Sequence, residues 1–246
     1  MSRERHMSGG GLGSPALRAA TVAVGILAAV LAFAAPPDAV QGEAQRLMYV
    51  HVPAAWSAYL CFAAVLVASI VFLRTRSARA AAVARAAGQV GLVLTALTLA
   101  SGMVWGALAW GTAWVWDGRT TSTVAMGLIY VIYLAARAAA HGRRSRTAAA
   151  WVGVLGFVSV PVVHMSVVWW RTLHQSATVL NGQGAPPIDA AMAVPLGAAV
   201  LTATLVTGQV IVALSRRELA SRAGASETAS QSSPTRRTTA DEWEVT

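Results

Sequence analysis

The chain has 246 residues, of which 56% are hydrophobic and only 12% are charged. A soluble domain has about twice that charged fraction, so composition excludes an ordinary soluble protein. All nineteen basic residues behind the net charge of +9 are arginines, and we assign them to the loops of a membrane protein, not to a nucleic-acid-binding surface. The single cysteine, Cys61, excludes a disulfide framework and a thiolate metal site.

Long apolar runs divide the chain, and each approaches the ~20 residues needed to cross a hydrocarbon core of ~30 Å. They predict an all-α integral membrane protein with six transmembrane helices. We expect a disordered tail at 1–16 and a disordered cytoplasmic tail at 215–246. The spans are expected near residues 17–35, 54–73, 86–104, 123–140, 148–168 and 190–214.

The first apolar run has a second interpretation as a cleaved signal. Ala32-Phe33-Ala34 resembles the small-residue site at which signal peptides are cleaved. The run is longer than the roughly 7–15 apolar residues of a signal peptide. We therefore expect it to be retained as the first span.

The arginines predict the orientation of the six spans. Sixteen fall in the tails and in the loops after the second and fourth spans, whereas Arg46, Arg119 and Arg171 fall on the opposite face. Cytoplasmic loops retain positive charge, so both termini are expected in the cytoplasm. The protein would then lie in the bacterial cytoplasmic (inner) membrane, with the loop between spans three and four on the outer, periplasmic face.

That outer loop is rich in tryptophan. Residues 105–119 read WGALAWGTAWVWDGR, with four tryptophans within twelve residues. An aromatic belt at the headgroups explains Trp151 on the inner face, but it should be shared between both interfaces. Seven of the nine tryptophans instead lie on the outer rim, so we interpret the loop as a flat binding surface. The rim tryptophans are Trp56, Trp105, Trp110, Trp114, Trp116, Trp169 and Trp170.

Two histidines are expected near the same face, at similar depth. His51 lies at the entrance of the second span and His164 near the outer end of the fifth. Either could be a helix-end histidine or a partner of a neighbouring helix, but together they form a candidate site. Two trans imidazoles suit a haem iron. Zinc would need a further ligand, and for His174 ligation and hydrogen bonding are equally open.

Charged residues close the tryptophan-rich loop. Asp117 and Arg119 could form a loop ion pair worth about 1 kcal/mol or less. Alternatively, Arg46, Arg119 or Arg171 could bind ligand carboxylates, because arginine favours planar bidentate contacts.

Three segments in this order resemble the haem exporter protein C (CcmC) family of cytochrome c maturation. Met48–Trp56 reads MYVHVPAAW, Trp110–Ser122 reads WGTAWVWDGRTTS, and Pro161–Gln175 reads PVVHMSVVWWRTLHQ. The middle segment resembles that family's tryptophan-rich haem-handling motif. Gly118 departs from the family pattern at a position where Ala or Pro is expected, which should loosen the turn.

The resemblance implies a transiently bound haem b at the outer surface, with His51 and His164 as the axial ligands of its iron. It also implies transfer to a periplasmic haem chaperone (CcmE), beside ATP-binding cassette transporter subunits (CcmA, CcmB) and a small membrane subunit (CcmD). The chain has no phosphate-binding Gly-Lys loop, so any ATP hydrolysis is expected to come from partner subunits. Because delivery requires ligation weak enough to release haem, we expect a delivery scaffold and not an enzyme. The expected haem contacts are His51, His164, Trp105, Trp110, Trp114, Trp116, Asp117, Arg119, Trp169 and Trp170.

Three alternatives remain. A secondary transporter or channel could use His51 and His164 as relays, although it would need acidic residues that the predicted helices lack. A cytochrome c synthetase subunit would usually have more spans and a large outer domain. A structural subunit without a ligand would leave the loop tryptophans unexplained.

Overall fold

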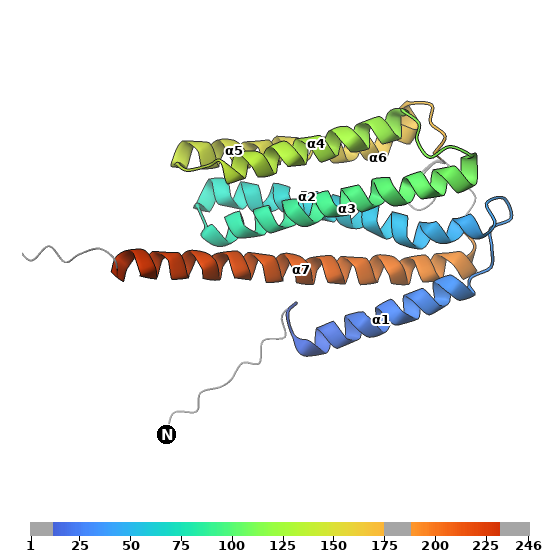
Figure 1. The fold of residues 1–246 in the computed structure, drawn as a ribbon, viewed down its shortest axis with the longest axis horizontal. Coiled ribbons are helices and arrows are strands. Elements are labelled where there is room, and N and C mark those ends of the chain that lie inside the picture. The colour runs from blue at the N-terminus through green and yellow to red at the C-terminus, as the bar shows by residue number, and fades with distance from the viewer. Residues whose placement is uncertain (1–11, 175–187, 232–246) are drawn as a thin grey trace, which may run out of the picture.

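The computed structural model describes residues 12–174 and 188–231, and these residues form an all-α bundle (Figure 1). Within them, six helical segments are long and apolar enough to cross a membrane, which confirms the predicted fold class. The predicted tails at 1–11 and 232–246 lie outside the described residues. The elements are α1 (Pro15–Ala34), η1 (Glu43–Leu47), α2 (Met48–Thr75), α3 (Ala78–Trp110), α4 (Gly118–Ala138), α5 (Arg143–Gly156), α6 (Ser159–Trp169) and α7 (Ala190–Gln231).

Local sequence signals set several helix ends. The Ser77 hydroxyl accepts a hydrogen bond from the Ala80 backbone N–H at 3.3 Å and so caps α3. Arg76 closes α2 in the left-handed conformation, with φ of 57°, which makes a tight turn between the two helices. At the far end of α3, Gly111 adopts φ of 72°, a conformation that glycine accepts without strain.

The fifth span is divided where one continuous helix was expected. Pro161 has no backbone N–H and cannot continue the regular hydrogen-bond pattern. The chain therefore tightens just before it, and Val160 N–H bonds to the Phe157 carbonyl three residues back, at 3.0 Å. As a result α5 and α6 are separate helices that together form one span.

The last helix is longer than predicted. We expected disorder from residue 215, but α7 continues to Gln231, so that prediction was wrong for residues 215–231. Glu218 stabilises this extension, because it pairs with Arg222 one turn along the helix and lies 3.8 Å from Arg85 of α3. Figure 1 shows this end of α7 projecting beyond the neighbouring helices.

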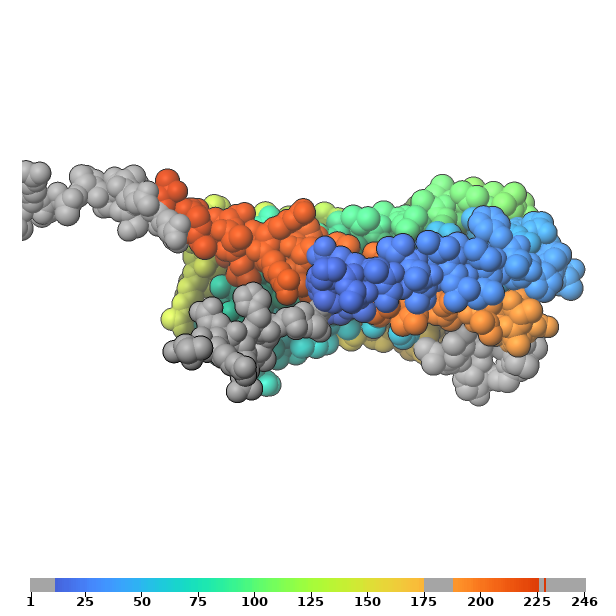
Figure 2. Space-filling model, turned by 90° about the horizontal axis from the view of Figure 1, so that it is seen from below, coloured from blue at the N-terminus to red at the C-terminus, as the bar shows by residue number. Residues whose placement is uncertain are grey.

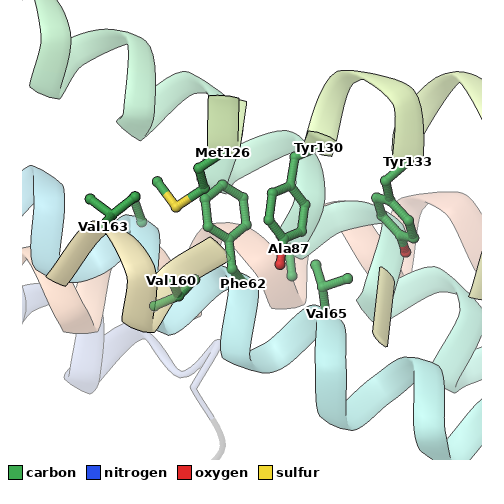
Figure 3. Packing of buried hydrophobic residues seen from close by; sticks show 9 residues of the cluster. Phe62, Val65, Ala87, Met126, Tyr130, Tyr133, Val160 and Val163 are labelled. Carbon is green, nitrogen blue, oxygen red and sulfur yellow. The ribbon is translucent and has the colours of Figure 1, made fainter. Parts of the chain in front are cut away.

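Buried hydrophobic side chains of α2, α3, α4 and α6, including the rings of Phe62, Tyr130 and Tyr133, form the core (Figure 3). The rings of Phe62 and Tyr130 stack with centroids 3.5 Å apart and planes 11° from parallel. Gly91 makes room for them, since a Cβ atom there would lie 2.6 Å from the Phe62 ring. Small residues allow membrane helices to approach closely where lipid gives no hydrophobic driving force.

The first helix packs along α7 at the edge of the bundle (Figures 1 and 2). Gln209 donates a hydrogen bond to the Thr21 hydroxyl at 2.8 Å, and Gly25 lets Thr202 approach closely. Most of the α1 surface remains outside these contacts, as expected for a helix that faces lipid.

The two ends of the bundle carry different side chains. We call one the Trp end; it comprises η1, the loop 111–117 and the segment 170–174. The other, the Arg end, comprises the turns at 76–77 and 139–142. The helix order thus brings the beginnings of α2 and α4 to the ends of α3 and α6 (Figure 1).

Candidate functional site

His51 lies in the first turn of α2 and faces α3. Its Nδ1 atom is 3.1 Å from the Ser101 hydroxyl, and its ring meets Trp105 edge-on at 5.6 Å. Gly102 gives the ring its space, because a Cβ atom there would lie 3.0 Å from Cε1 of His51. The His51 imidazole therefore packs against one stretch of α3 formed by Ser101, Gly102 and Trp105.

The hydrogen bonds of Ser101 determine which nitrogen of His51 carries the proton. The serine hydroxyl donates to the Leu97 carbonyl at 2.7 Å, so towards His51 it acts as an acceptor. His51 must then donate from Nδ1–H. In the neutral imidazole this leaves the lone pair on Nε2 available to a ligand.

His174 is anchored in a comparable way by other residues of the Trp end. Its Nδ1 atom lies 3.0 Å from Oδ2 of Asp117, and its ring meets Trp110 edge-on at 5.1 Å. The Thr172 hydroxyl accepts a bond from the His174 backbone N–H at 2.8 Å. These contacts join segment 170–174 to the tryptophan-rich loop.

Asp117 is the capping residue of α4 as well as the partner of His174. Burial favours its neutral form, but the Thr120 N–H at 2.8 Å and contacts with His174 and Thr172 outweigh that effect. The pKa of Asp117 is therefore lowered from its ordinary value of 3.8. A carboxylate can only accept, so Nδ1 of His174 carries the proton and Nε2 is left available.

His174 and His164 have different neighbours in the structure. His174 contacts Asp117 and meets Trp110 of the tryptophan-rich loop. His164, on α6, instead meets the ring of Tyr59 edge-on at 6.5 Å. The expectation that His51 and His164 lie at similar depth stays a prediction.

The tryptophans of the loop form an exposed aromatic surface. Trp114 and Trp116 meet edge-on at 5.0 Å, and 68% of Trp116 is exposed. The loop folds back over α3 at Gly106, where a Cβ atom would lie 2.9 Å from the Thr112 carbonyl. Such exposed rings offer a binding surface at little conformational cost.

A second aromatic pair follows α6. Trp169 and Trp170 meet edge-on at 5.9 Å, and both are about half exposed. Trp170 packs directly on Gly118, where a Cβ atom would lie 2.9 Å from the tryptophan Cβ. The glycine that we expected to loosen this turn instead permits close contact. Trp105 differs from the other tryptophans, because its indole N–H donates to Gln41 at 2.7 Å.

The three arginines at this end have different surroundings. Arg46 pairs with Glu43 and donates to the Phe33 carbonyl at 2.9 Å, so it fastens the end of α1. Arg171 is exposed. Arg119 is half-buried beside Tyr59, and its buried Nε has no hydrogen-bond partner among the described residues. The alternative of an Asp117–Arg119 ion pair is not realised, since the Asp117 carboxylate binds His174.

The zinc alternative lacks a ligand set. Within residues 12–174 and 188–231, no three His, Cys, Asp or Glu side chains converge to hold a metal ion. Two open hollows of about 550 and 360 Å³ lie at the Arg end, beside Arg143, and neither is lined by His51, His164 or His174. The Trp end thus offers two imidazoles beside exposed rings, an arrangement that suits a planar metal complex.

Sequence reasoning left the positions of Ser101, Gly102 and His174 unexplained. The spacing Ser101-Gly102-x-x-Trp105 puts Ser101, Gly102 and Trp105 on the α3 surface that faces His51. This helical spacing was visible in the sequence. The pairing of His174 with Asp117 joins residues 57 positions apart, and no local pattern signals it.

Comparisons of the sequence with known proteins all identify similarity to one family. The family model described as Heme exporter protein C (CcmC) matches residues 4–230. Heme exporter protein C of Bradyrhizobium diazoefficiens is 35% identical over 212 residues, covering 85% of this chain and 79% of the relative. The Escherichia coli K12 protein of that name is 40% identical over 178 residues, covering 70% and 71%. A ccmC-like mitochondrial protein of cytochrome c biosynthesis from Marchantia polymorpha is 36% identical over 162 residues, covering 66% and 68%.

The match to the family model covers the six spans and the three segments Met48–Trp56, Trp110–Ser122 and Pro161–Gln175. This match includes nearly all of the described residues, among them His51, His174 and the tryptophan-rich loop. The chain therefore belongs to the Heme exporter protein C family.

Proposed function

We propose that this protein binds haem b transiently at its Trp end and presents it to an acceptor during maturation of c-type cytochromes. The observation that carries the proposal is the matched anchoring of His51 and His174. Each donates from Nδ1 to a fixed oxygen, at 3.1 Å and 3.0 Å respectively, and each leaves Nε2 available. Hydrogen bonding of the second ring nitrogen is the usual way in which proteins orient histidine ligands to metals.

The geometry favours His174 over His164 as the second iron ligand. His174 is oriented by Asp117 and lies against Trp110 of the tryptophan-rich loop, whereas His164 lies against Tyr59 of α2. We therefore propose His51 and His174 as the axial pair. His164 would line the inner side of the site.

The other side chains of the site would bind the porphyrin and its propionates. The exposed rings of the loop would cover the apolar macrocycle, and Asp117 would hold His174 in place. Arg119, with its buried and unpartnered Nε, is the best candidate to neutralise a propionate. The remaining proposed contacts are Trp105, Trp110, Trp114, Trp116, Trp169 and Trp170.

The proposed cellular setting follows from charge and family. Arginines concentrate at the Arg end, so the Trp end would face the periplasm across a bacterial inner membrane. The acceptor would be the periplasmic haem chaperone (CcmE), and the transporter subunits (CcmA, CcmB) with the small subunit (CcmD) would supply ATP-driven steps. The protein itself would act as a scaffold that orients haem and excludes competing ligands.

A spectrum of the purified membrane protein tests this proposal. Loaded with haem, the wild-type protein should show the absorption of a six-coordinate bis-imidazole haem. The double variant His51→Ala/His174→Ala should lose that spectrum, and the matched variant His141→Ala at the Arg end should retain it. If the double variant kept the wild-type spectrum, the proposed ligands would be wrong.

A further inference from the structure

The two proposed ligands have chemically unequal anchors. His51 donates to the neutral hydroxyl of Ser101, whereas His174 donates to the carboxylate of Asp117. Building on the proposed haem site, we infer that His51 is the exchangeable ligand: its bond to iron breaks first when haem is transferred, while His174 stays bound.

The electronic argument starts from the charge of each anchor. A hydrogen bond to a carboxylate is roughly twice as strong as one between neutral groups, and it makes the opposite ring nitrogen a better donor to a metal. The Ser101 hydroxyl cannot give equal support, because its oxygen carries no formal charge.

The packing argument supports the same order of exchange. His174 lies outside the helices, but its ring contacts Asp117 and Trp110 and its backbone is bound to Thr172. Asp117 is itself held by the first turn of α4 through Thr120. The His51 ring lies over Gly102, and its hydrogen-bond partners are neutral, namely the Ser101 hydroxyl and the backbone of Thr98.

The exchange step needs no redox partner. The iron–Nε2 bond of His51 breaks, its electron pair returns to Nε2, and a donor atom of the acceptor supplies a pair to the vacated position. Carbon monoxide is a suitable probe of the reduced protein, because it takes the position of the weaker ligand. The vibrational frequency of the bound CO then reports electron donation from the ligand that remains opposite.

The test uses the full-length, haem-loaded protein in detergent, reduced and exposed to CO. Asp117→Asn keeps an oxygen that can cap α4 but removes the charge at His174. Ser101→Ala removes the His51 anchor, and Ser101→Thr is the matched control that restores it. We expect Asp117→Asn to shift the Fe–CO frequency, while Ser101→Ala leaves the frequency unchanged and speeds CO binding several-fold.

Other outcomes would overturn the proposal. A frequency shift with Ser101→Ala, alone or together with Asp117→Asn, would mean that His51 remains on the iron. No shift in either variant would mean that the anchors do not control exchange. Failure of the haem site itself is distinguishable, because His51→Ala/His174→Ala would then give the same CO adduct as the wild type.

A measurement without haem checks the starting geometry. In protein labelled with ¹⁵N-histidine, both His51 and His174 should carry their proton on Nδ1. Ser101→Ala should remove this preference at His51 only, and Ser101→Thr should restore it. Protonation of His51 on Nε2 in the wild type would contradict the unequal-anchor proposal.

Discussion

Asp117 and His174 are joined by a 3.0 Å contact between a helix-capping carboxylate and a ring nitrogen, across 57 residues of sequence. The contact fixes the end of the tryptophan-rich loop to the segment that follows α6. It also connects the stability of α4 to the orientation of a proposed haem ligand.

Two substitutions at Asp117 should separate these two effects. Asp117→Asn keeps a capping oxygen, so thermal stability should change little, while haem affinity should fall about 10- to 100-fold through His174. Asp117→Ala should lower haem affinity similarly and also cost about 1 kcal/mol of stability through the lost cap. Haem titration and thermal unfolding in detergent measure the two effects. Equal haem affinity in the wild type and Asp117→Asn would contradict this prediction.

The lowered pKa of Asp117 predicts how its contribution depends on pH. A carboxyl group with a depressed folded-state pKa stabilises the fold fully above its unfolded value, which is near 3.8. That contribution should disappear as the pH falls through the still lower folded-state pKa. Any difference in unfolding free energy between the wild type and Asp117→Asn should therefore shrink as the pH falls below about 3.8. A difference that grew on acidification would have the wrong sign.

The fold could be predicted from sequence where the signal was local. The lengths of the apolar runs predicted six spans, and the arginines correctly separated the two ends. The division at Pro161 was harder to predict, because proline is tolerated within many membrane helices. The helical extension of α7 depends on contacts of Glu218 with Arg85, which lies on another helix.

The candidate site was predicted in part. His51 and the loop tryptophans were identified from their position and composition. His164 was favoured over His174 because it lies in a predicted helix, whose geometry places the side chain along the membrane normal. The position of a histidine in a loop depends on the residues that it contacts. Only the folded chain brings His174 to Asp117 and Trp110.

The packing of Phe62 against Gly91 predicts a stability effect without any ligand. Gly91→Ala would put a methyl group 2.6 Å from the Phe62 ring and 2.9 Å from the Cys61 side chain. Such overpacking should cost about 1–3 kcal/mol. Gly197→Ala is the matched control, because no atom lies within 4 Å of its added Cβ. Thermal unfolding in detergent should show a lowered midpoint for Gly91→Ala only.

The tryptophans at the two ends predict different effects on haem binding. Trp110 and Trp151 are comparably exposed, at 40% and 51%, but only Trp110 contacts a proposed ligand, His174. Trp110→Ala should weaken haem binding several-fold, while Trp151→Ala at the Arg end should leave it unchanged. Haem titration of both variants measures this, and equal losses would support a belt role for both residues.

Electron paramagnetic resonance of the oxidised, haem-loaded protein tests the central claim most directly. The wild type and His164→Ala should both give the low-spin signal of an iron with two imidazole ligands. His51→Ala and His174→Ala should each lose that signal, because each removes one ligand. Retention of the signal in His174→Ala, together with its loss in His164→Ala, would contradict the proposed site and restore His164 as the second ligand.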